Sequence, residues 1–365
     1  MLQCLMNLYG KHLKNISQMN EEPIKRTDVN ELGEFGLIDH LTRNFPITRL
    51  STLRAMGDDA AVLAGQQQNM LVTTDMLLEG IHFDLAYMPL KHLGYKAVVV
   101  NLSDIYAMNG TPTQITVSIA FSNRYSVEAL EELYEGILAA CKKYNVDLVG
   151  GDTTSSLKGL VISITAIGFA DGENTTYRDG ARPGDLICVS GDLGAAYLGL
   201  QLLEREKRIW MEHPELQPDL EEQQYVVGRH LKPEARVDII KQFRDLKLVP
   251  TSMIDVSDGL SSELFHICKQ SGVGALIEEE GVPIHNEAQL LALKFQLDPI
   301  TCALNGGEDY ELLFTVRPED EEKVKHMQDI YIMGEIKEPD YGIKLRTKGG
   351  NIHILKAQGW NHFES

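Results

Sequence analysis

The sequence predicts a protein of the α/β (α+β) class with two domains. The chain has 365 residues, which is more than a single hydrophobic core usually organises. Short apolar runs of strand length alternate with longer segments of helical periodicity. The segment 178–194, RDGARPGDLICVSGDLG, is rich in Gly and Pro, and we place the domain boundary there. We therefore expect an N-terminal extension over 1–31, a first domain over 32–178 and a second domain over 179–365.

The first half should combine helices with a sheet of at least three strands. Gly110, with Pro112 just beyond it, marks the end of one long helix, and Ser126 is a good N-cap for the next. A polar turn at 65–68 should join the first two strands. We expect helices at 33–45, 90–110 and 126–145, and strands at 60–65, 69–75, 113–121, 146–151 and 160–170.

The second half begins with the strand LICVS and the helix AAYLGLQLLERE. Residues 206–224 are charged and interrupted by prolines, so we interpret them as a surface excursion. Residues 251–272 indicate a strand, a tight turn and a helix. We expect further helices around 222–231 and 234–246, and further strands at GALIEEE, ELLFTV, IYIMGE and GIKLRT.

The charge balance restricts the partners. The chain carries 34 basic and 53 acidic side chains, a formal net charge of −19. Such a surface repels nucleic acid and anionic membrane, so we expect neither as a partner. A phosphate-bearing substrate would need cations to mediate its binding, and a divalent metal ion is the obvious candidate.

The five cysteines and the hydropathy pattern predict a cytoplasmic protein. The cysteines are odd in number, widely spaced and without a CxxC pair, so we interpret them as reduced thiols. No run of 18 apolar residues is present to span a membrane. The N-terminal segment lacks the long apolar core and small-residue cleavage site of a secretory signal.

Several aspartates end an apolar strand or interrupt an apolar helix. Asp58 and Asp59 precede a strand, whereas Asp75, after Thr73 and Thr74, lies at the end of one. The others in this set are Asp104 in VVVNLSDIYAM, Asp152 in LVGGDTT, and Asp255 and Asp258 in MIDVSDGLSSEL. Burying a carboxylate without a partner costs several kcal/mol (on the order of 3–5) or forces it to take up a proton.

Divalent cations held by oxygen ligands would stabilise these carboxylates together. The lysines and arginines nearby are too few to pair with all of them. Mg²⁺ binds carboxylates, hydroxyls and waters, and it leaves positions for substrate phosphates. Thr73 and Thr74 would add hydroxyl oxygens, and no His/Cys cluster points to zinc. We therefore predict a magnesium site in one cleft shared by both halves.

Each acidic segment also has a purely structural interpretation. Two aspartates before a strand often form only a turn, and the TTD sequence could be a cap at a strand end. Asp104 could be a satisfied polar group of the core. In DVSDG, Ser257 and Asp258 are both good N-cap residues for the helix that follows.

The glycine-rich segments suggest phosphate binding. GGDTT at 150–154 lets backbone amides approach an anion, and GGEDYE at 306–311 precedes a strand. SGDLG at 190–194 offers a helix N-terminus to an anion, or it is a simple strand-to-helix turn. The chain lacks the P-loop GxxxxGK[ST] and the HRD and DFG motifs of protein kinases. A nucleotide would have to be held in another way.

These motifs together resemble the thiamine-monophosphate kinase family, in the superfamily of aminoimidazole ribonucleotide synthetase and selenophosphate synthetase. The matching segments run in order through most of the chain, and a final GWNHF resembles the C-terminal segment of the family. They are GEFGLI, GDDAAVL, TTDMLLEGIHF, KAVVVNLSDIYAMNGTP, LVGGDTT, RDGARPGD, IDVSDGLSSELFHI and NGGEDYELLFTV.

The resemblance implies two α/β domains with the site in the cleft between them, and a homodimer formed through the first, ATP- and Mg²⁺-binding domain. It implies the magnesium ligands Asp59, Thr73, Thr74, Asp75, Asp104, Asp152, Asp255 and Asp258. It implies ATP contacts at Tyr134, Gly151, Asp152, Arg178 and Ser257, and thiamine-phosphate contacts at His82, Glu308 and Trp360. Family members often have tyrosine where Trp360 stands. From the residues alone, we would interpret His82 as a surface histidine, Glu308 as an ordinary turn acid and Trp360 as a packing anchor for the C-terminal tail.

The function implied is transfer of the γ-phosphoryl group of ATP to thiamine monophosphate, giving thiamine diphosphate. Catalysis would rest on Asp75, Asp104, Asp152 and Arg178 with several Mg²⁺ ions. One alternative is a related ATP-dependent synthetase of the same superfamily with another substrate. Aminoimidazole ribonucleotide synthetases usually carry a DGVGTK-like segment where this chain has TTDMLLEG. Selenophosphate synthetases carry a reactive Cys or selenocysteine near a lysine, a setting that Cys4 lacks. A second alternative is a non-catalytic nucleotide- or metal-binding module.

Overall fold

The computed structural model describes residues 37, 40–54, 62–63, 68–171, 173–218 and 220–356. Asp58, Asp59 and Trp360 lie outside these residues. So do the extension 1–31, residues 33–36, 38 and 39 of the helix expected at 33–45, and most of the turn expected at 65–68.

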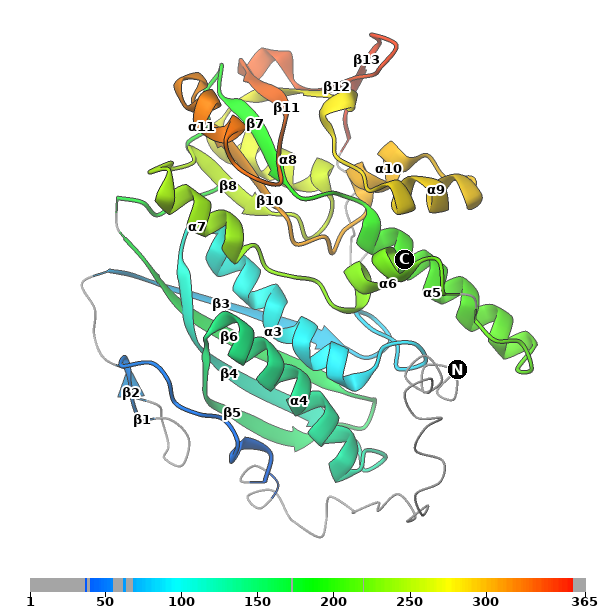
Figure 1. Ribbon diagram of the computed structural model, residues 1–365. Coiled ribbons are helices and arrows are strands. Elements are labelled where there is room, and N and C mark those ends of the chain that lie inside the picture. The colour runs from blue at the N-terminus through cyan, green and yellow to red at the C-terminus, as the bar shows by residue number, and fades with distance from the viewer. Residues whose placement is uncertain are drawn as a thin grey trace.

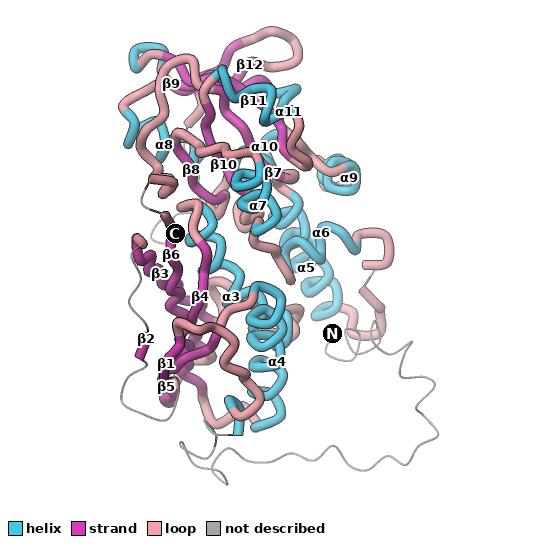
Figure 2. Tube along the Cα trace, turned by 60° about the vertical axis from the view of Figure 1, so that its left-hand side comes forward, coloured by secondary structure: helices cyan, strands magenta, loops and turns pink. Residues whose placement is uncertain are grey.

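The first half builds a four-stranded sheet with the strand order β3-β6-β4-β5. Two long helices, α3 (Leu90–Ala107) and α4 (Val127–Tyr144), cover one face of it (Figures 1 and 2). β4 and β5 are parallel and the other pairs are antiparallel. The strands are β3 (Asn69–Leu78), β4 (Thr111–Phe121), β5 (Asp147–Ser155) and β6 (Val161–Ala170), and β1 (Thr52–Arg54) pairs with β2 (Val62–Leu63) as a separate ribbon.

The second half builds a seven-stranded mixed sheet with the order β13-β12-β9-β11-β7-β10-β8. Its strands are β7 (Leu186–Ser190), β8 (Ser252–Asp255), β9 (Gly274–Glu278), β10 (Leu312–Val316), β11 (Ile330–Lys337), β12 (Ile343–Arg346) and β13 (Ile352–Ile354). Its helices are α5 (Ala195–Glu212), α6 (Gln224–Leu231), α7 (Val237–Asp245), α8 (Leu260–Ser271), α9 (Asn286–Lys294), α10 (Pro299–Asn305) and α11 (Glu321–Lys325). Short 3₁₀ turns lie at Glu279–Gly281, Pro318–Asp320 and Pro339–Tyr341.

The α+β class is confirmed, and so are the long elements. Ser126 is the N-cap of α4, and its hydroxyl accepts a hydrogen bond from the Ala129 amide at 3.3 Å. The surface excursion was expected to begin at residue 206. That start is wrong, because α5 continues to Glu212. Several short elements were not expected, namely β1, α9, α10, α11 and β13.

The two halves share one apolar core. A continuous cluster of buried side chains runs from the α3–α4 layer of the first half to α5, α7 and β10 of the second. Val98 on α3, Leu198 on α5 and Phe314 on β10 all belong to this cluster. The shared core fixes the relative position of the two sheets, and therefore of residues that come from both.

The other face of the four-stranded sheet is open in the described part of the chain. Figure 2 shows α3 and α4 on one side of the sheet and no described helix on the other. On β3 the apolar side chains of Met70, Val72 and Met76 are 54%, 61% and 54% exposed. An open sheet face with exposed apolar side chains is typical of a surface that binds another protein chain.

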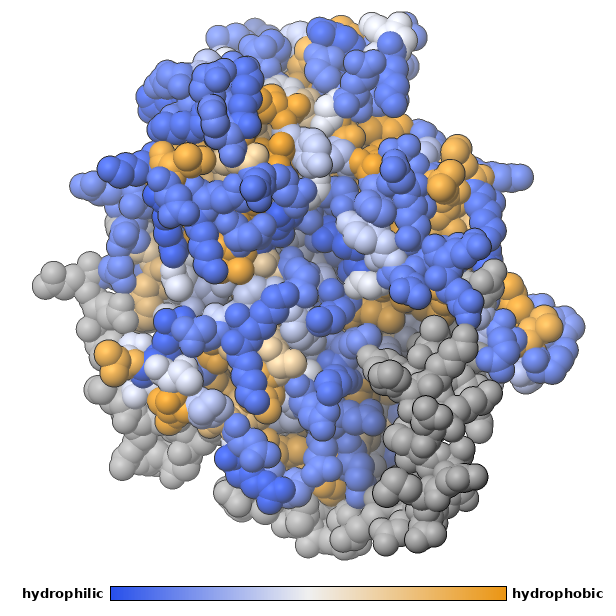
Figure 3. Space-filling view, in the orientation of Figure 1, coloured by the Kyte–Doolittle hydropathy of each residue, from blue (hydrophilic) through white to orange (hydrophobic). Residues whose placement is uncertain are grey.

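The surface on the side seen in Figure 3 is mainly polar. No helix within the described ranges is long and apolar enough to cross a membrane.

Candidate active site

A pocket of about 440 Å³ lies where the two halves meet, and it collects residues from four segments. Thr73 comes from β3, Asp104 from α3, Arg178 from the connection between the halves, and Asp255 from the end of β8. These residues are far apart in sequence. The structure therefore brings together four of the residues that the sequence singled out.

Short hydrogen bonds join these side chains. The Thr73 hydroxyl donates to Oδ2 of Asp104 at 2.5 Å. The Ser103 hydroxyl donates to Oδ2 of Asp255 at 2.6 Å, which links α3 to the second half. The backbone amide of Asp75 donates to Oδ1 of Asn101 at 3.0 Å. We define Asp75, Asp104 and Asp255 as the acidic cluster. The helix α3 supplies Asp104, and its neighbours Asn101 and Ser103 bond to Asp75 and Asp255.

Burial, and for Asp75 and Asp255 also the charge of Asp104, disfavours ionisation of the carboxylates in the acidic cluster. Burial, and then the neighbouring Asp104, raise the pKa of Asp75 to about 6. Burial, followed by the charge of Asp104, raises the pKa of Asp255 to about 7. Burial also raises the pKa of Asp104, against the opposing effects of the Thr73 hydroxyl and the Arg178 charge. The pocket therefore holds more negative charge than Arg178 compensates, which is the electrostatic setting of a cation site.

The ligand set fits a hard cation such as Mg²⁺, because Asp104, Asp255 and Thr73 offer carboxylate and hydroxyl oxygens among the lining residues of the pocket. Among the described residues, no three His, Cys, Asp or Glu side chains converge tightly enough to hold an ion by themselves. Mg²⁺ commonly uses one or two carboxylates and completes its shell with waters and substrate phosphates. The cluster matches that mode of binding better than a closed protein cage.

Two other predicted ligands do not join the cluster within one chain. Thr74 lies on the opposite face of β3 from Thr73 and Asp75, where its hydroxyl donates to the Ile164 carbonyl at 3.0 Å. Asp152 lies on β5, three strands from β3, or roughly 14 Å at the usual strand spacing. The register aligns Asp152 with Met76 on the open face.

Gly151, next to Asp152, has a structural requirement of its own. A Cβ atom at this position would lie 1.8 Å from the Val117 carbonyl oxygen of the adjacent strand β4. Any side chain here would force β4 and β5 apart. The glycine is therefore explained by strand packing, independently of any phosphate.

Ser257, Asp258 and Glu308 come together beside Asp255. The Glu308 amide donates to the Ser257 carbonyl at 2.7 Å. The amide of Asp258 donates to Oε1 of Glu263 at 2.9 Å, and the N-cap of α8 is Gly259. The alternative that Ser257 or Asp258 serves as the N-cap is therefore wrong, because Glu263 reaches back from the first turn instead.

His82 and Tyr134 occupy different surroundings. His82 lies in a tight turn after β3, where its Nδ1 accepts from the Leu78 amide at 3.1 Å. Tyr134 faces the core from α4, only 7% exposed, with its ring edge-on to Phe45 at 6.4 Å. Asp59 and Trp360 lie outside the described residues.

The helix N-terminus after SGDLG is already occupied by an anion of the chain itself. The Asp309 carboxylate accepts from the amides of Gly194 at 2.7 Å and Ala196 at 3.2 Å. Asp309 is fully buried, and its carboxylate meets the positive end of α5. The interpretation of 190–194 as a phosphate site is therefore wrong, and the segment is a strand-to-helix turn stabilised from within.

Sequence reasoning did not single out Asn101, Ser103 or Lys96. All three are polar residues on the otherwise apolar helix α3, and all are buried. Their signal in the sequence is the same as that of Asp104, a polar side chain interrupting KAVVVNLSDIYAM. The site thus depends on more of this helix than the acidic residue alone.

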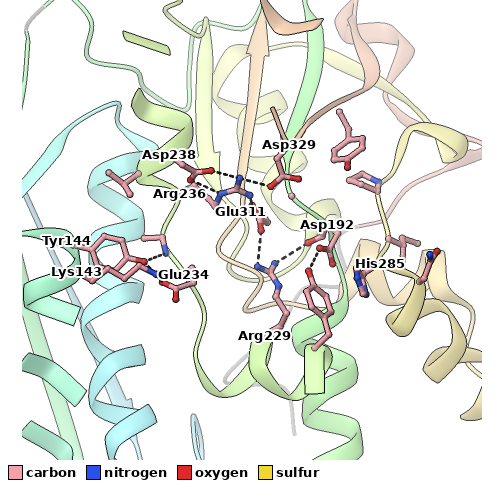
Figure 4. A pocket seen from close by; sticks show the side chains of 18 residues that line it. Lys143, Tyr144, Asp192, Arg229, Glu234, Arg236, Asp238, His285, Glu311 and Asp329 are labelled. Carbon is pink, nitrogen blue, oxygen red and sulfur yellow. Dashed lines mark hydrogen bonds and ion pairs between the residues drawn. The ribbon is translucent and has the colours of Figure 1, made fainter. Parts of the chain in front are cut away.

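A second pocket, of about 770 Å³, lies between α4, the α6–α7 connection and the β10–β11 loop. Figure 4 shows Arg229 and Arg236 converging on Glu311 inside it. Arg229 Nη1 lies 2.9 Å from Glu311 Oε1, Arg236 pairs with the other oxygen, and Arg236 Nη2 also contacts Asp329 at 2.7 Å. Because each of these charged groups has an opposite charge beside it, we interpret this wall as structural support for Glu311.

The comparison with known proteins agrees with this geometry. Residues 57–170 match the family described as AIR synthase related protein, N-terminal domain, and residues 182–343 match the corresponding C-terminal domain. The chain is 36% identical to the thiamine-monophosphate kinase of Aquifex aeolicus (strain VF5) over 335 residues, 92% of this chain and 99% of that one. It is 34% identical to that of Bacillus subtilis (strain 168), over 91% of this chain and 100% of the relative.

A solved structure described as AaThiL complexed with AMPPCP and TMP superimposes with a TM-score of 0.70. Its sequence is 35% identical to this chain, and the match covers 92% of this chain and 98% of that structure. The similarity extends through both domains and across the pocket between them. The chain therefore belongs to the thiamine-monophosphate kinase family, built from two AIR synthase related domains.

Proposed function

We infer that this protein phosphorylates thiamine monophosphate to thiamine diphosphate, with ATP as the phosphoryl donor, in the biosynthesis of thiamine diphosphate. The observation that carries this conclusion is the acidic pocket between the domains, with Thr73, Asp104, Arg178 and Asp255 around it. It occurs in a chain whose relative AaThiL has been solved with AMPPCP and TMP. ATP is accordingly the co-substrate and thiamine monophosphate the acceptor.

The transfer needs no general base from the protein. The second pKa of a phosphomonoester is about 6, so the acceptor oxygen is already largely ionised near neutral pH. The barrier lies in bringing two polyanions together in line. We assign Arg178 to the attacking or transferred phosphate, because its side chain is exposed to the pocket that Asp104 and Asp255 line.

We propose that the acidic cluster holds Mg²⁺, with several ions bound in the complete site. Bound Mg²⁺ supplies the positive charge that neutralises the phosphates of the two substrates. The raised pKa values of Asp75 and Asp255 support this, because burial, and then the charge of Asp104, make their ionised forms unfavourable without a nearby cation. We keep as ligands the full set Asp59, Thr73, Thr74, Asp75, Asp104, Asp152, Asp255 and Asp258.

The substrate contacts remain assignments from the family. We propose that Tyr134, Gly151, Asp152, Arg178 and Ser257 contact ATP, and that His82, Glu308 and Trp360 contact thiamine monophosphate. The bond between the Glu308 amide and the Ser257 carbonyl supports adjacent sites for the two substrates, as direct transfer requires.

We further propose a homodimer formed through the open face of the four-stranded sheet. The exposed Met70, Val72 and Met76 support this face as the interface. The position of Asp152 also supports it. Asp152 lies on the open face, roughly 14 Å from β3 of its own chain, so it could serve an acidic cluster only by reaching around the β3 edge of a second copy.

The proposed location is the cytoplasm. The four described cysteines, Cys141, Cys188, Cys268 and Cys302, are buried and unpaired, as expected in a reducing compartment.

The deciding experiment is incubation of the purified protein with ATP, Mg²⁺ and thiamine monophosphate, followed by chromatography of the products. We expect thiamine diphosphate and ADP in equal amounts. ADP without thiamine diphosphate, or no turnover at all, would contradict the proposed function. Thiamine in place of its monophosphate is the matched control, because it lacks the acceptor phosphate.

A further inference from the structure

A buried lysine of the first domain has no part in the mechanism above. Lys96 lies on α3, and its side chain is only 1% exposed. A buried ammonium group is unfavourable unless it is paired and hydrogen-bonded. Its Nζ lies 2.9 Å from Oε1 of Glu308 and donates to the His230 carbonyl at 3.2 Å. Both partners belong to the second domain.

The other oxygen of the same carboxylate lies beside a buried histidine. Nδ1 of His230 lies 3.1 Å from Oε2 of Glu308, and the His230 ring is buried. The Glu308 backbone has a left-handed conformation, with φ at 66°. A non-glycine residue adopts this conformation only when its surroundings stabilise it. Glu308 is thus fixed in both its backbone and its carboxylate.

The loop around Glu308 is anchored separately within the second domain. Asp309 accepts hydrogen bonds from the N-terminus of α5, and Glu311 pairs with Arg229 and Arg236. Lys96 adds a connection from this loop to the first domain. The Glu308 side chain remains 28% exposed, so that part of it is still accessible to a ligand.

The loop also lies close to the acidic cluster. Tyr310, two residues after Glu308, has a pKa raised well above its ordinary value, first by burial and then by Glu308 and the three cluster carboxylates. On α3, Asp104 follows Lys96 by eight residues, a rise of about 12 Å. One helix therefore carries both a cluster aspartate and the lysine that holds Glu308.

We propose that Lys96 is a positioning residue for the acceptor, which holds the Glu308 carboxylate in one orientation for thiamine monophosphate through an ion pair between the domains. This proposal rests on the proposed function, in which Glu308 contacts that substrate. An ionised carboxylate suits the positively charged thiazolium ring of thiamine. Burial alone would raise the pKa of Glu308, but Lys96 and His230 together hold it well below its ordinary value.

Steady-state kinetics of Lys96→Met test the proposal, because methionine keeps most of the side-chain length and removes the charge. We expect KM for thiamine monophosphate to rise at least about tenfold and KM for ATP to change less than about twofold. Lys91→Met is the matched control, because Lys91 lies on the same helix in an exposed pair with Glu135 at 2.8 Å. That variant should have normal KM values for both substrates.

A double-mutant cycle with Glu308→Gln tests whether Lys96 acts through Glu308. The double variant should have a KM for thiamine monophosphate less than about twofold above that of Glu308→Gln alone. If the two substitutions raised KM for thiamine monophosphate by independent factors that multiply in the double variant, the proposal would be overturned. Equal increases in KM for both substrates would also overturn it. A normal KM for Lys96→Met beside a raised KM for Glu308→Gln would overturn the positioning role alone. A normal KM for Glu308→Gln would instead overturn the substrate contact in the proposed function.

Lys96→Arg keeps the proposal testable if Lys96→Met fails to fold. The guanidinium keeps the charge but is larger and planar, so it should pair with Glu308 in a displaced orientation. KM for thiamine monophosphate should rise selectively, by less than in Lys96→Met where both variants fold. If the ratio of KM for thiamine monophosphate to KM for ATP were the same in Lys96→Arg as in the wild type, the proposal would be overturned.

Discussion

Individual side chains in the pocket are arranged around Asp104. It accepts a hydrogen bond from Thr73 on β3, and the Ser103 beside it bonds to Asp255 of the second domain. Its charge also raises the pKa values of Asp75 and Asp255. Asp104 therefore links the sheet of the first domain, the helix α3 and the second domain in one site.

Replacement of Asp104 by asparagine should abolish turnover while the fold remains intact. Asparagine has nearly the same shape and can still accept from Thr73, but it lacks the charge needed to bind a divalent cation. We expect kcat to fall by at least about 100-fold, with an unchanged circular dichroism spectrum. Asp245→Asn, at the exposed end of α7, is the control. Near-normal activity of the Asp104 variant would rule out the magnesium role.

His230 should make the protein less stable in acid. Burial, and then the charge of Lys96, lower the pKa of its imidazole below the unfolded value of 6.5. The unfolded state therefore binds more protons below about pH 6.5, so stability is present above that pH and falls as the pH decreases toward the folded pKa. The free energy of unfolding should fall by up to about 1.4 kcal/mol per pH unit for this one group.

Urea denaturation between pH 7.5 and 5.5 measures this slope. His230→Asn should have a flatter dependence than the wild type, because asparagine does not titrate. His213→Asn, at an exposed position after α5, should keep the wild-type slope. Equal slopes for the His230 variant and the wild type would exclude the assignment.

At the scale of elements, the packing of α3 against α4 depends on two glycines. A Cβ atom at Gly94 would lie 1.9 Å from the Leu133 carbonyl oxygen on α4. A Cβ atom at Gly136 would likewise lie 1.9 Å from the Lys91 carbonyl oxygen on α3. The helix backbones therefore touch at two reciprocal points. This contact holds α3, and with it Asp104 and Lys96, against the sheet.

Gly136→Ala should lower the free energy of unfolding by about 1–3 kcal/mol, because the methyl group must push the two helices apart. Gly228→Ala is the matched control, since a methyl group on that helical glycine would meet no atom within 4 Å. It should raise stability by roughly 0.5–1 kcal/mol through higher helix propensity. Denaturant titration of both variants provides the measurement. A Gly136 variant as stable as the wild type would show that the helices can separate without cost.

The sequence predicts the long elements better than the short ones. The helices α3 and α4 span 18 residues each, enough for periodicity and caps to define them. α10 and α11 have 7 and 5 residues, too few for a periodic pattern to emerge. Their existence depends on tertiary contacts that a local pattern does not contain.

The same distinction applies to the site. Asp75, Asp104 and Asp255 could be predicted because each is an acidic residue in an apolar segment. The alternation of a strand could also have separated Thr74 from Thr73, because neighbouring side chains face opposite ways. The position of Asp152 depends on pairing across three strands, and the pair of Lys96 and Glu308 joins residues 212 positions apart. Neither is encoded by a local motif.

At the scale of the whole molecule, one chain contains two incomplete halves of the proposed site. The acidic cluster faces the second domain, on the helix-covered side of the sheet, whereas Asp152 lies on the open side. Because β3 and β5 are the two edge strands of this sheet, a cyclic dimer formed through the open faces could bring the Asp152 of each copy around the β3 edge of the other, toward its acidic cluster. Catalysis would then require residues of both copies at each site.

Mixing two inactive variants tests this arrangement. Asp104→Asn and Asp152→Asn should each be inactive alone, because each lacks one half of every site. After unfolding and refolding together in equal amounts, half of the dimers should contain one chain of each kind, and one of the two sites in such a dimer is intact. We expect recovery of about a quarter of wild-type activity, with dimer mass confirmed by light scattering.

The control is the same mixture with Met70→Asp added to both chains, which places a charge on the open face at a position that is 54% exposed and lies outside the active-site pocket. It should give monomers and no recovered activity, since a buried unpaired carboxylate opposes association through this face. Inactivity of the first mixture despite formation of mixed dimers would show that Asp152 does not complete the partner's site. Full activity of the Asp152 variant by itself would remove that residue from the magnesium set, leaving the acidic cluster as the site within one chain.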